Sequence, residues 1–402
     1  MKPINLFSLF AFTAIVMLIA CKNAPKQPTV IPASETTLPT PPPSPKPEVY
    51  IYMVSVDKLN LRDQSNKNGK VITQFPLGDY VEGIGEVSAN KEEATLRGIP
   101  YNEPYFKVTS TTPDQITGWA YSAGLEIVYA GPRTTIPDLG KLSSFARFLK
   151  TLDVKKIDSG NKAWTYVAQN LASAQGTLSD ATFIILEKFL FRMETEGSFY
   201  ELTDKIKWME PDYEAITNET FDMNKYPATK ILAENGFKLA QGEGMVFPVV
   251  DLSKLGAAFA TKVTPPMKNY VEQSILEQKD IILDDDGIVI PLEQVADRAA
   301  WWEKFNLANP YFVLSEETQN AQHSLLFFLI CGANNTPVFQ GENELVSEDF
   351  KKAWAYVQQK YAETELGRSV KEMSDLVTTS GGKRTQKVNA LMEKYLAVDG
   401  GR

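Results

Sequence analysis

Side chains suited to metal binding or nucleophilic chemistry are scarce in this 402-residue sequence. It contains one histidine, His323, and two cysteines, Cys21 and Cys331. A structural zinc site or a multi-histidine metal site needs more ligands of these types than the chain holds. The sequence therefore predicts no metal centre and no disulfide framework, and we expect no cofactor.

His323 and Cys331 are the residues that a thiol nucleophile would use. Cys331 follows His323 and ends the apolar run 325–330, whereas thiol peptidases place the cysteine well before the histidine, at the head of a helix. A thiol in apolar surroundings stays protonated, because burial disfavours the thiolate. We therefore expect Cys331 to pack in the core.

Carboxylates offer the remaining route to catalysis. Glycan cleavage needs one acid with a raised pKa and often a second carboxylate. Glu243 with Asp251 could supply such a pair, and so could the segment Glu194-Thr195-Glu196-Gly197. Neither spacing is diagnostic, since 50 acidic residues produce such pairs by chance. A carboxylate-dependent hydrolase therefore stays open as an alternative.

The segment Asp284-Asp285-Asp286-Gly287 has two interpretations. If Gly287 is the sixth residue of a calcium loop, the first ligand position falls on Ile282, which offers no oxygen from its side chain. Apolar residues flank the Asp-Gly pair on both sides, which is the pattern of a tight hairpin. The sequence favours a hairpin turn.

The N-terminus predicts export and membrane attachment. Lys2 precedes an apolar run over residues 6–20, which is the layout of a signal peptide at 1–20. Leu18-Ile19-Ala20-Cys21 resembles the bacterial lipobox, in which the signal is cleaved and the cysteine is acylated. Each buried methylene of an acyl chain such as palmitate contributes about 0.8 kcal/mol, so several chains hold a protein on a membrane. The resemblance implies a lipid anchor on Cys21 in the bacterial cell envelope. The lack of aspartate at 22–23 favours the outer membrane, facing the periplasm.

Residues 21–48 join this anchor to the rest of the chain. Nine prolines fall between Lys22 and Glu48. Proline favours an extended polyproline II conformation of about 3.1 Å per residue, so the segment can hold a domain roughly 80 Å from a membrane. We expect a spacer, and a polyproline ligand at Pro41–Pro45 is the alternative.

From residue 49 to 131, short runs rich in Val, Ile, Tyr and Thr alternate with Gly, Pro, Asn and Asp, which is typical of a small all-β fold. The segments that carry the pattern are Leu59-Asn60-Leu61-Arg62, Gly69-Lys70-Val71-Ile72, Leu77-Gly78-Asp79-Tyr80-Val81, Tyr105-Phe106-Lys107-Val108 and Thr117-Gly118-Trp119-Ala120-Tyr121. In order and spacing they resemble the bacterial SH3-type domain, which implies a small β-barrel. A polar insertion, Ala89–Glu103, lengthens one hairpin of that family.

The resemblance also implies ligand binding, because many such domains bind peptidoglycan or its peptide stems, while others act as spacers. Aromatic faces offer stacking area, and arginine binds carboxylates through two hydrogen bonds. Core packing remains an equal alternative for the aromatic residues, whereas Leu59 and Leu61 must face the core by alternation. The residues that we expect at a ligand are Asn60, Arg62, Tyr105, Trp119 and Tyr121.

A break rich in glycine and proline at 131–140 precedes a change to a helical period of apolar residues. We expect a mainly helical domain over residues 140–400, with one helix opening at Ser179-Asp180. Two β-like pieces, 236–250 and 281–290, interrupt it. The predicted fold class is therefore multidomain: a small all-β SH3-like barrel, then a mainly α-helical domain with one or two small β-hairpins.

The formal net charge of -9 makes nucleic acid an unfavourable partner, because an acidic surface repels phosphate. We expect an envelope lipoprotein whose SH3-type domain binds peptidoglycan or an envelope protein. The helical domain is expected to bind a partner or ligand.

Overall fold

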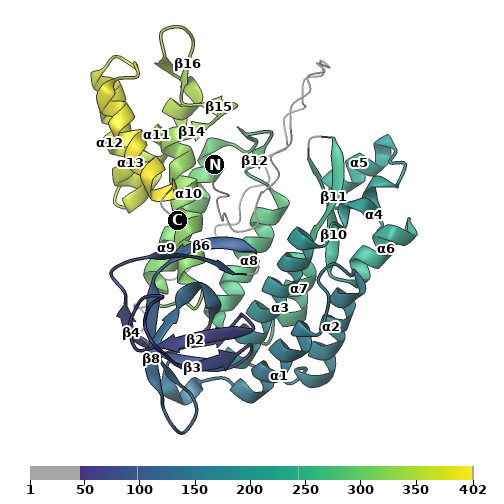
Figure 1. Ribbon diagram of the computed structural model, residues 1–402. Helices are drawn as coiled ribbons and strands as arrows, with labels where there is room; N and C mark the ends of the chain where they lie inside the picture. Colours follow the sequence, from purple (N-terminus) through teal and green to yellow (C-terminus); the bar gives the residue numbers. More distant parts are fainter. Residues whose placement is uncertain (1–45, 97, 243, 401–402) are drawn as a thin grey trace.

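The computed structural model describes residues 46–96, 98–242 and 244–400 (Figure 1). An antiparallel sheet spans residues 49–131, and a mostly helical region follows from residue 139. Cys21, the expected signal peptide and most of the proline-rich segment lie outside the described residues. Among the helices of the described ranges, none has the length and apolar character needed to span a bilayer.

Seven strands form the N-terminal sheet in the order β3-β2-β8-β7-β4-β1-β9, and every pair is antiparallel. Strands β3 and β9 are its two edges, and no hydrogen-bonded pairing within the described chain closes the sheet into a barrel. The strands are β1 (Val49–Val54), β2 (Lys58–Arg62), β3 (Val71–Pro76), β4 (Tyr80–Val87), β7 (Tyr105–Ser110), β8 (Thr117–Tyr121) and β9 (Leu125–Gly131).

One face of this sheet encloses a small core of its own. Side chains alternate across a strand, so Leu59 and Leu61 of β2 are buried while Asn60 and Arg62 point to the other side. The insertion forms a separate hairpin of β5 (Glu92–Leu96) and β6 (Ile99–Glu103), which packs against the small core through half-buried apolar side chains. The residues of this small core are Val54, Val56, Leu59, Leu61, Phe75, Val81, Tyr105, Val108, Ala120 and Tyr121.

The opposite side chains of β1 and β9 belong to the large core of the helical region. Ile51 and Met53 of β1 and Val128 of β9 are buried in the same cluster as Phe145 and Leu186 of the helices. Burying apolar surface on both sides of a junction stabilises it by about 25 cal/mol per Å². The sheet and the helices are therefore joined by a continuous core.

Charged pairs surround this junction. Arg147 of the first helix lies 2.8 Å from Asp79, and Lys150 pairs with Asp57. Such exposed pairs contribute little to stability, so the shared apolar core is the main link between the sheet and the helices.

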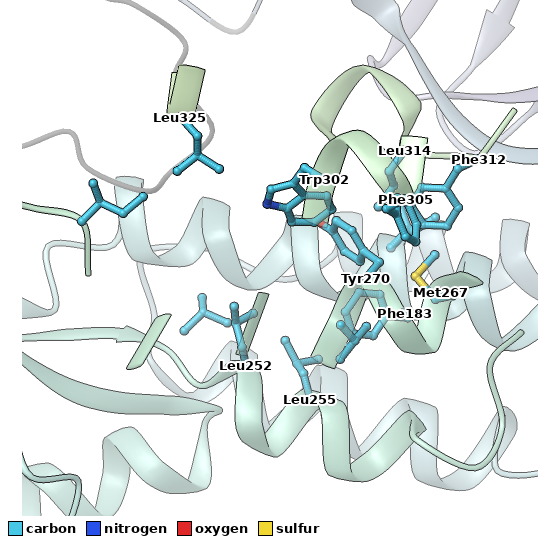
Figure 2. Packing of buried hydrophobic residues seen from close by; sticks show 14 of the residues in the cluster. Phe183, Leu252, Leu255, Met267, Tyr270, Trp302, Phe305, Phe312, Leu314 and Leu325 are labelled. Carbon is cyan, nitrogen blue, oxygen red and sulfur yellow. The ribbon is translucent and has the colours of Figure 1, made fainter. Parts of the chain in front are cut away.

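The helical region contains thirteen helices among the described residues, and α3 runs through its centre. Four consecutive residues of α3, Phe183 to Leu186, are buried, which is the pattern of a helix surrounded by protein. Figure 2 shows Phe183 near Leu255 and Tyr270, with Trp302 and Phe305 in the same core. The helices are α1 (Leu139–Lys150), α2 (Asp158–Asn170), α3 (Thr177–Glu196), α4 (Tyr200–Asp204), α5 (Glu210–Thr217), α6 (Pro227–Glu234), α7 (Leu252–Phe259), α8 (Pro265–Lys279), α9 (Leu292–Ala308), α10 (Ser315–Cys331), α11 (Glu348–Lys360), α12 (Glu365–Thr379) and α13 (Gln386–Gly400).

Four small hairpins interrupt the described helices, more than the one or two that the sequence predicts. Three of them have strands of only two residues, too short to leave an alternating pattern in the sequence. The hairpin predicted at Asp284–Gly287 is confirmed, and Asp285 and Asp286 adopt the positive φ values of a tight turn. The strands are β10 (Phe237–Gly242) with β11 (Met245–Val250), β12 (Leu283–Asp284) with β13 (Gly287–Ile288), β14 (Gly332–Ala333) with β15 (Thr336–Pro337), and β16 (Phe339–Gln340) with β17 (Leu345–Val346).

The start of α3 differs from the prediction. The helix begins at Thr177 after Gly176, so Ser179 and Asp180 lie inside it and are buried. The Asp180 carboxylate instead accepts hydrogen bonds from the backbone N–H and the hydroxyl of Thr264, at 2.8 and 2.6 Å. The Asp180 carboxylate, which the sequence places at the opening of its own helix, thus holds the N-terminus of α8.

Candidate functional site

Three neighbouring strands of the sheet bring a cationic and aromatic row together, and its tryptophan packs against the small core. Arg62 of β2 and Lys107 of β7 are both cross-strand partners of Trp119 of β8. The Lys107 ammonium lies 5.7 Å from the centre of the Trp119 ring and 2.9 Å from the Glu86 carboxylate. All three side chains of the row are half-buried, so part of each stays accessible. We call Arg62, Lys107 and Trp119 the cationic row.

Arg62 and Asn60 of β2 both form hydrogen bonds within the β2–β3 hairpin. Arg62 Nη1 donates a 2.7 Å hydrogen bond to the carbonyl of Gly69 in the turn between β2 and β3. Asn60 Oδ1 accepts one of the same length from Gln74 Nε2. A guanidinium held in this way still presents further N–H groups, which can bind a planar anion such as a carboxylate.

Tyr105 and Tyr121 lie beside the cationic row but are covered. Their exposed fractions are 5% and 7%, and their rings meet edge to face at 5.3 Å. The Tyr121 hydroxyl donates to the carbonyl of Glu92 at 2.6 Å and accepts from the N–H of Glu103 at 3.1 Å. The Tyr105 hydroxyl donates to Glu92 Oε2 at 3.3 Å. These two residues hold the β5–β6 hairpin, which is the predicted insertion.

The electrostatics of Tyr105 connect this hairpin to the cationic row. Burial raises the pKa of the Tyr105 hydroxyl, and the Glu92 carboxylate raises it further. The positive charge of Arg62 acts in the opposite direction. Arg62 and Glu92 therefore both lie close enough to the same hydroxyl to influence it.

Two of the carboxylates that a hydrolase could use, Glu194 and Asp251, accept hydrogen bonds from backbone N–H groups. Asp251 Oδ1 accepts from the N–H of Lys254 at 2.9 Å and caps α7. Glu194 accepts from the N–H of Val250 at 2.6 Å, and burial raises its pKa to about 7. Glu243 lies outside the described residues. Clefts of about 430 Å³ between α1 and α2 and about 380 Å³ between α11 and α12 are lined by neither Glu194 nor Asp251.

The side chains of His323 and Cys331 are not placed together as a catalytic pair. They lie eight residues apart on α10, which corresponds to about 12 Å along the helix axis. The Cys331 thiol is 3.7 Å from the carbonyl of Met392 and is only half-buried, so it is less enclosed than the sequence predicts. Within the described ranges, no group of three His, Cys, Asp or Glu side chains is arranged to hold a metal ion.

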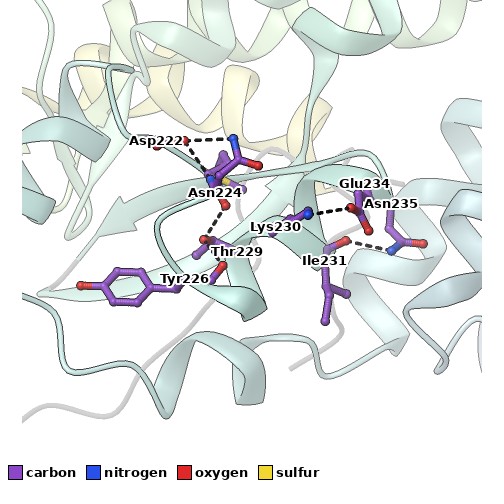
Figure 3. Close-up of polar contacts among 9 residues, drawn as sticks. Asp222, Asn224, Tyr226, Thr229, Lys230, Ile231, Glu234 and Asn235 are labelled. Carbon is purple, nitrogen blue, oxygen red and sulfur yellow. Dashed lines mark hydrogen bonds and ion pairs between the residues drawn. The ribbon is translucent and has the colours of Figure 1, made fainter.

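A second polar group surrounds α6 (Figure 3). Thr229 Oγ1 donates to the carbonyls of Met223 and Tyr226, and Asn235 Nδ2 donates to the carbonyl of Ile231. These contacts join side chains to nearby backbone at both ends of one helix. They order the chain around α6 and leave no converging set of donors for a ligand.

Sequence reasoning missed the buried Glu187 of α3 and did not connect it with Asp180 and Glu194, which it considered separately. Asp180, Glu187 and Glu194 are spaced by seven residues, which places them on one face of a helix. Burial raises the pKa of Asp180 to about 6 and that of Glu187 to about 8. The sequence does show acidic residues at a seven-residue spacing in an otherwise apolar helix. This spacing alone does not predict burial, because it is equally typical of a helix face exposed to solvent.

Comparison with protein-family models, with curated proteins and with solved structures found no match for this chain.

Proposed function

We propose that this chain is a lipid-anchored lipoprotein of the bacterial cell envelope. Its sheet region acts as an SH3-type module that binds peptidoglycan or a peptide ligand. The lipid on Cys21 holds the protein on the outer membrane facing the periplasm, and residues 21–48 act as the spacer. The helical region provides a partner- or ligand-binding surface.

The cationic row is the observation that supports binding. Arg62 and Trp119 are cross-strand partners on β2 and β8, and the Lys107 ammonium lies 5.7 Å from the centre of the Trp119 ring. An indole ring with cations on the two neighbouring strands suits a ligand that has an apolar part and a carboxylate. Peptide stems of the cell wall have this chemistry, because they end in carboxylates and contain small apolar side chains.

The test is co-sedimentation of the full chain, purified in detergent, with isolated peptidoglycan sacculi. Trp119→Ala and Arg62→Ala should each lower the affinity about tenfold or more, as expected for aromatic and arginine residues at the centre of an interface. Arg62→Lys keeps the charge but loses the paired N–H groups, so it should also bind weakly. Lys205→Ala removes an exposed cation of the helical region and serves as the matched control. Equal binding by all four variants and the wild type would contradict the proposal.

The second candidate function is a carboxylate-dependent peptidoglycan hydrolase. One observation favours it: the Glu194 carboxyl has a pKa of about 7, suited to a general acid. The same sacculus assay separates the two functions, because a hydrolase releases soluble fragments. Release that is lost in Glu194→Gln or Glu243→Gln, with folding unchanged by circular dichroism, would favour hydrolysis. Sedimentation without release favours binding.

A further inference from the structure

The β5–β6 hairpin places an acidic side chain beside the cationic row. Glu92 Oε2 accepts a 2.8 Å hydrogen bond from the backbone N–H of Lys67, which belongs to the turn between β2 and β3. The same oxygen accepts from the Tyr105 hydroxyl at 3.3 Å. One carboxylate oxygen of the hairpin is therefore held by two donors that belong to the sheet region.

These donors form a carboxylate-binding arrangement. A backbone N–H, a phenolic hydroxyl and a guanidinium are the groups that proteins use to bind a carboxylate. The guanidinium of Arg62 is fixed on the same turn through Gly69, two residues after Lys67. Its charge also acts on the Tyr105 hydroxyl, as that of Glu92 does. A free carboxylate in this position would meet the same donors that Glu92 meets.

Apart from the Glu92 carboxylate, the hairpin is held by two hydrogen bonds of the Tyr121 hydroxyl, which donates to the carbonyl of Glu92 and accepts from the N–H of Glu103. Its two strands pair only with one another and do not join the seven-stranded sheet. Ala94, Leu96 and Tyr101 pack on the small core but stay half-buried, and Ile99 is 41% exposed. An isolated two-stranded hairpin is marginally stable in water, so few contacts have to be replaced for this one to open. In Figure 1 the arrow of β6 lies apart from those of β2, β3 and β8.

We propose that Glu92 fills a carboxylate-binding site formed by the N–H of Lys67 and the hydroxyl of Tyr105, on the turn that Arg62 contacts, and that a carboxylate-bearing peptide displaces the hairpin to bind there. The hairpin is then an intramolecular competitor of the ligand. This inference rests on the proposed function, because it needs the cationic row to bind a ligand. The inference adds that the ligand presents a carboxylate and that this carboxylate replaces Glu92 of the hairpin.

The test compares Glu92→Gln with Glu93→Gln in the full chain in detergent. Both variants lose one negative charge from the same hairpin, but only Glu92 contacts Lys67 and Tyr105. The probes are sacculi, the dipeptide acetyl-D-Ala-D-Ala and the same dipeptide with its C-terminal carboxylate amidated. Hydrogen exchange of the β5–β6 amides reports opening of the hairpin independently of binding.

Glu92→Gln should weaken protection of the β5–β6 amides and raise affinity for sacculi by about threefold to tenfold, as for the loss of one charge-assisted hydrogen bond. Glu93→Gln should match the wild type. The free dipeptide should lower amide protection in the wild type, and the amidated one should not.

Two results would overturn the inference in different ways. If Arg62→Ala abolishes sacculus binding while Glu92→Gln and Glu93→Gln bind alike, the cationic row binds ligand but the hairpin does not compete for it. If Glu92→Gln opens the hairpin and still neither the wild type nor any variant binds sacculi or dipeptide, the proposed function itself fails.

Discussion

Replacing Glu187 with glutamine should change the pH dependence of stability. Glu187 lies in the middle of α3 and is only 4% exposed. Burial raises the pKa of its carboxyl to about 8; the charge of Glu317 raises it further, while that of Lys188 lowers it. Tyr270, on the neighbouring helix α8, is buried as well, and the Glu187 charge raises its pKa. A neutral carboxyl is therefore the form that this core accommodates.

The direction of the pH dependence of stability follows from the raised pKa of Glu187 in the folded chain. A carboxyl whose pKa is higher in the folded than in the unfolded chain contributes its full stability below the unfolded pKa of 4.5 and loses it as pH rises towards 8. Because one pKa unit corresponds to about 1.4 kcal/mol, the whole change has an upper bound of roughly 5 kcal/mol. Glu187→Gln stays neutral at every pH, so this loss should vanish in the variant.

The assay is urea unfolding of wild type and variant at intervals from pH 4.5 to pH 8.5. At the acidic end the two free energies of unfolding should agree within about 1 kcal/mol, since both side chains are neutral. At the alkaline end the variant should be more stable by up to roughly 5 kcal/mol. Glu196→Gln, at an exposed position of the same helix, serves as the control and should show no such crossover. A variant that is less stable than wild type by a constant amount at all pH values would refute the reasoning.

Three further substitutions test the packing. Ile51→Ala, in the part of the sheet that joins the large core, should cost about 2–5 kcal/mol, and near-UV and far-UV circular dichroism should then change in a single transition. Two separate transitions would contradict a continuous core. Trp354→Phe leaves the carbonyl of Leu329 without its 2.8 Å donor and should lower the free energy of unfolding by about 1–3 kcal/mol in urea titrations. Arg147→Ala removes a pair with Asp79 whose side chains are 57% and 30% exposed, so calorimetry should register less than about 1 kcal/mol.

Local signals predicted much of the secondary structure. Helix α6 begins at Pro227, because proline is favoured in the first turn of a helix and its position is visible in the sequence. The alternation in β2 correctly placed Leu59 and Leu61 in the core. The hairpin at Asp284–Gly287 followed from its turn residues. These features depend on residues within one turn or one strand, so a single sequence is enough to see them.

Contacts between distant segments could not be predicted in this way. The sequence predicts Tyr105 and Tyr121 at a ligand, but the β5–β6 hairpin that precedes β7 covers both tyrosines. Asp180 looks like a cap for its own helix and holds another one 84 residues later. In each case the tertiary fold determines which residue is the hydrogen-bond partner, and no residue spacing in the sequence indicates that partner.

The apolar junction between β1 and the helices limits how easily the sheet can be transferred to another protein during evolution. A gene segment that encoded only the sheet would carry Val49, Ile51 and Met53 into a new protein as an exposed apolar stripe. Such a stripe on an isolated small protein promotes self-association. The sheet could therefore move into another gene only together with its helices, or after polar replacements along β1. Polar residues at these three positions would identify a relative in which the sheet stands alone.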